Sequence, residues 1–192
     1  LFRSNDPTPA GAPGFTPPEA PTHLRGTVIG VEQALLDSVS PTIRRPLDGA
    51  LKLLKSLGAE LRDVSLPRMQ ALLDLGGVIS STEAASIHLE QMREHPDGYA
   101  TDLFTRMQSG LAMPAMHYLH ALRSRAAMLA ENRAAVFAQC DALFAPVIAQ
   151  PVPTRDESRT HTAEDVGRIH GPLVRFTRPF SYLGLPEIGR AH

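Results

Sequence analysis

The sequence lacks the features that mark several common classes of protein. It contains a single cysteine, Cys140, so no disulfide can form within the chain. It also contains no long apolar run of the kind that forms a signal peptide or a membrane-spanning helix. These absences predict a soluble, cytoplasmic protein that does not associate with membranes, although an exported protein that has lost its leader would share them.

An excess of charge of one sign is absent as well. The 192 residues include 19 Lys and Arg against 20 Asp and Glu, which gives a net charge of -1. We therefore expect that the chain binds neither nucleic acid nor an anionic membrane. No Walker loop, dinucleotide-binding fingerprint or paired-cysteine motif occurs, so the sequence predicts no cofactor and no zinc site.

The length is sufficient for one domain with a sizeable core. Residues 4–21 consist mainly of Pro, Gly, Thr and Ala, so we predict that residues 1–23 form a linker or surface arm. Residues 24–192 are expected to form the folded part. The chain opens on Leu1 rather than Met, and we expect that the natural N-terminus lies elsewhere.

Hydrophobic patterning in the first half predicts an α/β unit. Residues 27–31 are β-branched and apolar, as in a short buried strand, and residues 59–67 alternate before Pro67 ends them. A helix lies between them, with a start signal at Ser40 and a C-terminal Gly58. This order predicts two parallel strands joined by a right-handed crossover. Pro46 interrupts the helical pattern, so we expect the regular helix to start near residue 45.

The second half is predicted to be mostly helical. Helices are expected over residues 68–93 and 102–109, followed by a strongly patterned helix from Pro114. A short strand is expected at residues 142–145, and residues 155–168 are polar and predicted to be exposed. Apolar residues at spacings of three and four predict one buried helix face, formed by Ala115, Leu119, Leu122, Ala126, Leu129, Val136 and Cys140.

The segment "GGVISSTEAA", residues 76–85, is a candidate nucleophile loop because a glycine-rich turn can expose a serine. A serine nucleophile needs a nearby base and free backbone donors. Ser80 and Ser81 fall within the predicted long helix, where backbone N–H groups are already used. We interpret this serine pair as structural.

Two further candidates lie near the patterned helix. His117 and His120 have a spacing that can share a metal, but no third ligand stands nearby, so surface histidines are the favoured interpretation. Arg106 lies shortly before Gly110 and Pro114, where its guanidinium could hold an anionic ligand group. From local sequence alone, a capping or ion-paired arginine is favoured over that role.

Six stretches in order give a more specific signal. They are "LRGTVIGV" with "ALKLLKSLGAELRDVSLP", then "SSTEAA", "RMQSG", "YLHALRSRA", "CDALFAPVIAQPVP" and "FTRPFSYLGLP". Together they resemble the C-terminal part of the amidase signature family, whose members include the amide-hydrolysing subunit of glutamyl-tRNA amidotransferase. The resemblance covers residues 24–186.

The resemblance implies a partial, incomplete α/β fold in which helices flank a mixed β-sheet. It also implies hydrolysis of carbon–nitrogen amide bonds by a serine, a second serine in a cis peptide, and a lysine. All three lie upstream of the matching region, so this chain would form a wall of the substrate pocket and would be inactive alone. Its uncovered faces would favour oligomerisation or association with the missing N-terminal half.

Two positions bear on the substrate. The "RMQSG" match places Arg106 where the amidotransferase subunit has an arginine that holds the substrate carboxylate. Val174 stands where that subunit has an aspartate, and an ammonium group without an acidic partner would keep its desolvation cost. A general amidase acting on a small amide therefore fits better than a glutamine amidotransferase fragment.

Two departures from the family pattern remain. Ser181 stands where many relatives have Asn, and the final "EIGRAH" differs from the family pattern, which indicates a truncation or a shifted reading frame. Two other functions stay open at this point. The chain could be a non-catalytic binding or assembly module, or an unrelated metalloenzyme that uses His117 and His120.

Overall fold

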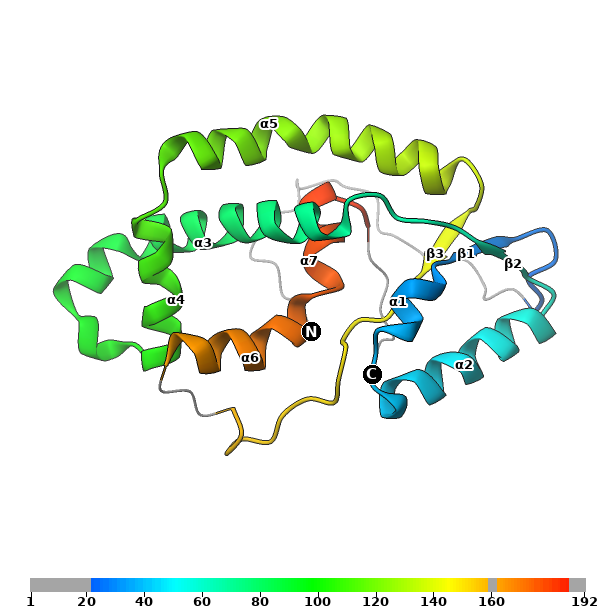
Figure 1. Cartoon of the computed structure of the whole chain (residues 1–192), viewed down its shortest axis with the longest axis horizontal. Helices are drawn as coiled ribbons and strands as arrows, with labels where there is room; N and C mark the ends of the chain where they lie inside the picture. Colours follow the sequence, from blue (N-terminus) through cyan, green and yellow to red (C-terminus); the bar gives the residue numbers. More distant parts are fainter. Residues whose placement is uncertain (1–21, 159–161, 187–192) are drawn as a thin grey trace, which may run out of the picture.

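The computed structural model describes residues 22–158 and 162–186, which form a small sheet joined to a larger helical part (Figure 1). The predicted arm falls almost wholly within residues 1–21, outside the described residues. The strands are β1 Val28–Val31, β2 Glu60–Asp63 and β3 Ala142–Phe144. The helices are α1 Gln33–Asp37, α2 Pro41–Ser56, α3 Met69–Glu94, η1 Pro96–Gly98, α4 Thr101–Leu111, α5 Ala115–Asn132, the π-helical η2 Arg133–Phe137, α6 Ala163–Val174 and α7 Thr177–Leu183.

The sheet has the order β2-β1-β3 and is parallel throughout the described strands. Val28 of β1 pairs with Glu60, and Ile29 pairs with Ala142 on the other side. The α/β class, the flanking helices and the parallel strand–helix–strand unit expected from the sequence are thus confirmed. The mixed sheet of the resembling family is represented here by parallel strands alone.

A buried cluster joins the sheet to the helical part. Its members come from α1 and the loop after it, the loop after β2, η2, the loops before and after β3, and the start of α7: Leu35, Val39, Val64, Leu66, Val136, Cys140, Ala149, Phe176 and Phe180. A second contact lies farther into the helical part, where Leu72 of α3 packs with Tyr182 and Leu183 of α7. Tyr182 Oη also donates a 2.7 Å hydrogen bond to the carbonyl of Ala121 in α5. Helix α7 is therefore held between α3 and α5.

The start of α2 differs from the prediction, because the helix begins at Pro41 and not near residue 45. The amides of Ile43 and Arg44 both donate to the carbonyl of Ser40, which forms the first turn. Pro46 lies inside the helix on its exposed side, so the carbonyl that loses its amide partner is near water.

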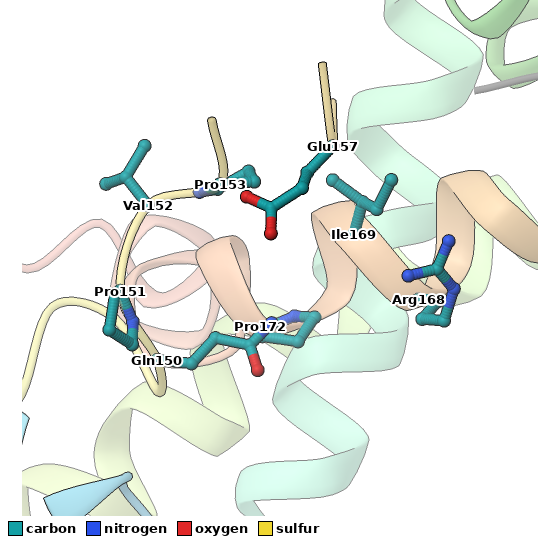
Figure 2. A pocket seen from close by; sticks show the side chains of 8 residues that line it. All are labelled: Gln150, Pro151, Val152, Pro153, Glu157, Arg168, Ile169 and Pro172. Carbon is teal, nitrogen blue, oxygen red and sulfur yellow. The ribbon is translucent and has the colours of Figure 1, made fainter. Parts of the chain in front are cut away.

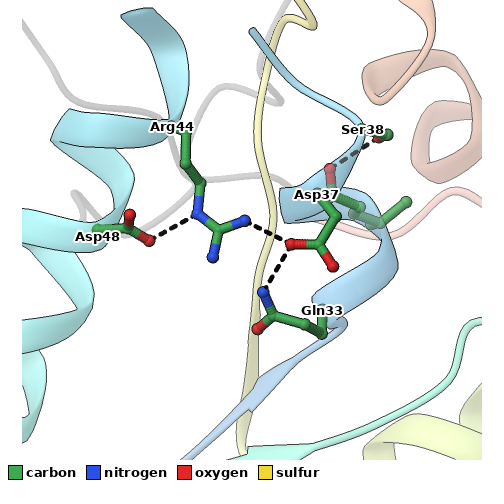
Figure 3. A network of polar contacts seen from close by, with 6 residues as sticks. Gln33, Asp37, Ser38, Arg44 and Asp48 are labelled. Carbon is green, nitrogen blue, oxygen red and sulfur yellow. Dashed lines mark hydrogen bonds and ion pairs between the residues drawn. The ribbon is translucent and has the colours of Figure 1, made fainter. Parts of the chain in front are cut away.

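Arg44 also fixes the start of α2 against α1 (Figure 3). Its Nη1 lies 2.6 Å from Asp37 Oδ1, and its Nε lies 2.7 Å from Asp48 Oδ1. Gln33 Nε2 donates to the same Asp37 oxygen at 2.9 Å. These hydrogen bonds, with that of Arg44 first, lower the pKa of the Asp37 carboxyl.

The buried face predicted for α5 is wrong in its first part. Leu119 and Leu122 are 46% and 40% exposed, and Ala115 and Ala126 are exposed too. The fully buried position in the middle of α5 is Ala121, which faces α7. The periodic pattern indicates a face that requires cover, but the described residues cover only the part of it at Leu129, which is half-buried and packs against Leu72, Tyr182 and Leu183. The later members, Val136 and Cys140, are buried as predicted.

The polar segment 155–168 is exposed as expected at its described positions except for the half-buried Asp165, but its second half begins α6. Thr162 caps this helix by accepting a 3.1 Å hydrogen bond from the amide of Asp165. No helix among the described residues is long and apolar enough to cross a membrane.

Gly110 is where α4 crosses α3 at close range. A Cβ at this position would lie 2.1 Å from the carbonyl oxygen of Ser81 and 2.8 Å from Ala85 Cβ.

We predict that Gly110→Ala lowers the free energy of unfolding by about 2 kcal/mol, because the helices must separate. Gly49→Ala in α2 is the matched control, since a Cβ there meets nothing within 4 Å. Its expected effect is a gain of about 0.5–1 kcal/mol, measured by urea denaturation. Equal effects of the two substitutions would contradict the assigned crossing.

Glu32 and Asp37 provide a test of opposite pH effects. Burial raises the pKa of the Glu32 carboxyl, and the charge of Asp63 adds to this despite a hydrogen bond from the Leu66 amide. Its folded-state pKa lies above the unfolded value, so its contribution to stability is complete below the unfolded pKa and is lost as pH rises through the folded one. The lowered pKa of Asp37 acts in the opposite sense, and its contribution is lost as pH falls.

We therefore predict that Glu32→Gln makes the free energy of unfolding rise more steeply from acidic to neutral pH than in the unsubstituted chain. Asp37→Asn should make that rise shallower. The measurement is urea denaturation at a series of pH values. Changes in slope of the same sign for both variants would show that these carboxyl groups are placed wrongly.

Candidate functional site

The crossing of α3 and α4 forms a pocket of about 320 Å³ to which α7 adds one residue. It contains Arg106 and the serine pair, which the sequence singled out separately. It also contains Arg178, which the sequence analysis did not identify. The lining residues are Gly77, Ser80, Ser81 and Ala84 of α3, Leu103, Arg106, Met107 and Ser109 of α4, and Arg178 of α7.

The two serines in this pocket are integrated into α3. Ser80 Oγ donates to the carbonyl of Gly77 at 3.2 Å, and Ser81 Oγ donates to the same carbonyl at 2.9 Å. The lining includes no carboxylate, imidazole or lysine that could take a proton from either hydroxyl. This arrangement provides neither the base nor the free backbone donors that a serine nucleophile needs.

Arg106 lies in the middle of α4 with its side chain exposed at the pocket. Within the described part of the chain its guanidinium forms no ion pair, and it caps no helix. The capping or ion-paired role favoured by the local sequence is therefore not what the structure has. Arg106 is instead available to an anionic ligand.

Arg178 is the second cation of the pocket and is half-buried. No ion pair to an acidic side chain neutralises it among the described residues. Burial lowers the pKa of its guanidinium, and the nearby positive charge of Arg106 lowers it further. The pocket therefore contains two unneutralised positive charges and no negative one.

A second pocket, of about 410 Å³, lies between the loop after β3 and α6 (Figure 2). Its charged side chains already have partners. The amide and hydroxyl of Thr154 both donate to Glu157 Oε2 at 2.8 Å, which lowers the pKa of this carboxyl. Arg168 lies 3.1 Å from Asp165. This pocket is less suited to a charged ligand than the one that contains Arg106.

The remaining sequence candidates lie elsewhere. His117 and His120 are exposed on α5. Across residues 22–158 and 162–186, no group of three or more His, Cys, Asp or Glu could hold a metal ion. Val174 is the last residue of α6 and is half-buried, and Ser181 is exposed in α7.

Comparisons with known proteins agree on one family. The model of the family described as Amidase matches residues 3–191. An amidase of Pseudomonas putida is 29% identical over 189 residues, covering 96% of this chain and 39% of the relative. A glutamyl-tRNA(Gln) amidotransferase subunit of Thermosynechococcus vestitus is 27% identical over 190 residues, covering 86% and 38%.

A solved structure supports the same relation. A crystal structure of an amidase superposes with a TM-score of 0.66 at 28% sequence identity, covering 84% of this chain and 37% of that one. The chain thus spans less than two fifths of the length of each of these relatives.

Proposed function

Because the chain belongs to the amidase family, we propose that it forms the C-terminal, substrate-binding part of an enzyme that hydrolyses carbon–nitrogen amide bonds. In this proposal, the reactive serine, the second serine and the lysine belong to polypeptide upstream of the matching region. The pocket at Arg106 supplies recognition of the substrate. The observation that carries the proposal is the match of the amidase model over residues 3–191.

The chemistry of the pocket supports a role in recognition. It presents the guanidinium of Arg106, and its serine hydroxyls donate to the backbone of α3. A guanidinium binds a carboxylate through two parallel hydrogen bonds, which fixes both the position and the orientation of the ligand. Holding a remote acid group in this way would place the scissile amide against a nucleophile supplied by the rest of the enzyme.

The reaction would then proceed by acyl transfer. The serine oxygen attacks the amide carbonyl, the amine leaves with a proton, and water releases the acid from the acyl-enzyme. This chain would contribute binding energy to the first step without touching the reacting atoms. Its Arg106 is accordingly proposed as a substrate-binding residue.

The proposed substrate is a small amide that carries an acid group rather than glutamine. By the family resemblance, Val174 stands where the amidotransferase subunit has an aspartate, and valine carries no charge. The lining of the Arg106 pocket also contains no carboxylate. An α-ammonium group would gain no ion pair there and would be repelled by Arg106 and Arg178.

The exposed face of α5 supports a second candidate role in assembly. Met116, Leu119 and Leu122 are 71%, 46% and 40% exposed. We propose that the polypeptide that supplies the nucleophile covers this face, since burying these side chains would stabilise the complex. Self-association through the same face is the alternative for a non-catalytic module.

The chain alone is predicted not to hydrolyse a nitroanilide, because positioning without a nucleophile and proton relay leaves little catalysis. The measurement is release of nitroaniline by the purified chain. A variant in which both Ser80 and Ser81 are replaced by Ala serves as the matched control and should behave identically. Turnover that disappears in this variant would place the chemistry on α3 and refute the proposal.

In a complete enzyme that contains this segment, we predict that Arg106→Ala raises KM about tenfold for an anilide with a carboxylate on its acyl group, with a smaller change in kcat. The methyl ester of the same anilide should show no such increase, because it carries no negative charge. Arg45→Ala on the exposed surface of α2 is the control arginine. Equal effects of Arg106→Ala on both substrates would remove the carboxylate-binding role.

A further inference from the structure

Arg178 reaches the pocket by crossing α3 at its glycine pair. A Cβ at Gly76 would lie 2.8 Å from Arg178 Cγ and 3.3 Å from its carbonyl oxygen. A Cβ at Gly77 would lie 3.4 Å from Arg178 Nη1. Each glycine within a helix costs about 1 kcal/mol relative to alanine. The pair therefore weakens α3, and the absence of a side chain at Gly76 provides the space through which the Arg178 side chain passes. A Cβ at Gly77 would be in ordinary contact with Arg178 Nη1.

Among the described residues, no acidic side chain forms an ion pair with Arg178. Its half-buried guanidinium and that of Arg106 are the only charged groups among the lining residues. The loss of water and the proximity of Arg106 both lower the pKa of Arg178. One monoanion would neutralise one of these guanidinium groups, whereas two negative charges would neutralise both.

Other donors in the pocket are already used. The hydroxyls of Ser80 and Ser81 donate to the carbonyl of Gly77, and that of Ser109 donates to the carbonyl of Arg106 at 2.7 Å. Selection of an anion in this pocket thus falls to the two guanidinium groups. The serine oxygens keep lone pairs that can accept hydrogen bonds from a guanidinium.

We propose that Arg178 is a second substrate-binding residue, and that Arg106 and Arg178 together select an amide substrate whose acyl part carries two negative charges. This inference depends on the proposed function at one point, which is that the bound dianion is part of an amide substrate. The pairing of the two arginines on one dianion is independent of turnover. A dicarboxylic group is the simplest chemical class that meets this requirement.

The test compares succinate with butyrate, which have four carbons each but carry two charges and one. Isothermal titration calorimetry of the full chain at constant ionic strength should give a Kd for succinate about tenfold lower than for butyrate. Arg178→Gln should remove this preference. Arg123→Gln, on the exposed side of α5, should leave it unchanged. Equal affinities in the unsubstituted chain, or an unchanged preference in Arg178→Gln, would overturn the proposal.

A second measurement does not depend on any variant that could fail to fold. The side-chain Nε–H signals of Arg106 and Arg178 can be followed by NMR in the unsubstituted chain during titration with succinate. Both signals should shift with the same Kd, while that of Arg123 should not. A shift at Arg106 alone would overturn the assignment of Arg178.

Failure of this inference is separable from failure of the proposed function. If succinate binds at both arginines but a complete enzyme containing this segment hydrolyses no amide, the proposed function is wrong and the dianion site stands. If the complete enzyme hydrolyses amides and the chain shows no preference for succinate, the dianion site is wrong and the proposed function stands.

Discussion

The close crossing of α3 and α4 at Gly110 is the contact on which the pocket depends. The carbonyl of Ser81 occupies the space that any side chain at position 110 would need, so the two backbones approach as closely as helices can. Since both helices are stiff over several turns, this one contact fixes Arg106 relative to Ser80 and Ser81. Helix α7 packs on α3 through Leu72, Tyr182 and Leu183, and this contact carries Arg178 to the same pocket.

Helix α3 lies at the centre of the helical part. Its sequence therefore predicts a helix but does not show which helices pack against it. It packs against α4, α5 and α7, so its small and apolar residues are distributed around the helix and form no single stripe. Gly76 has no room for a side chain because Arg178 and Tyr182 of α7 lie close to it, and Gly77 and the two serines line the pocket. A glycine and serine-rich segment can thus indicate close packing as readily as a catalytic loop.

The sequence predicted those features that depend on local pattern. The parallel strands at residues 28–31 and 60–63, the long α3 and the αL residue Gly58 follow from alternation, helix propensity and turn chemistry, and the structure has them. Local pattern also predicted that α5 is amphipathic, but it could not identify the partner of each face. Leu119 and Leu122 are exposed because the packing that buries Ala121 is set by α7, some sixty residues later in the chain.

Arg178 was missed for the same reason, because its position beside Arg106 is created entirely by tertiary structure. A half-buried guanidinium without an acidic partner among the described residues is unfavourable for folding, since it has lost water without gaining a counter-ion. An anionic ligand that pairs with this guanidinium would offset the cost on binding. Under the proposed function, this cationic pocket and the nucleophile belong to different parts of the enzyme. The acid group of the proposed substrate would then be bound equally in the ground state and the transition state, which lowers KM and leaves the increase in kcat to the parts of the enzyme that contact the reacting amide.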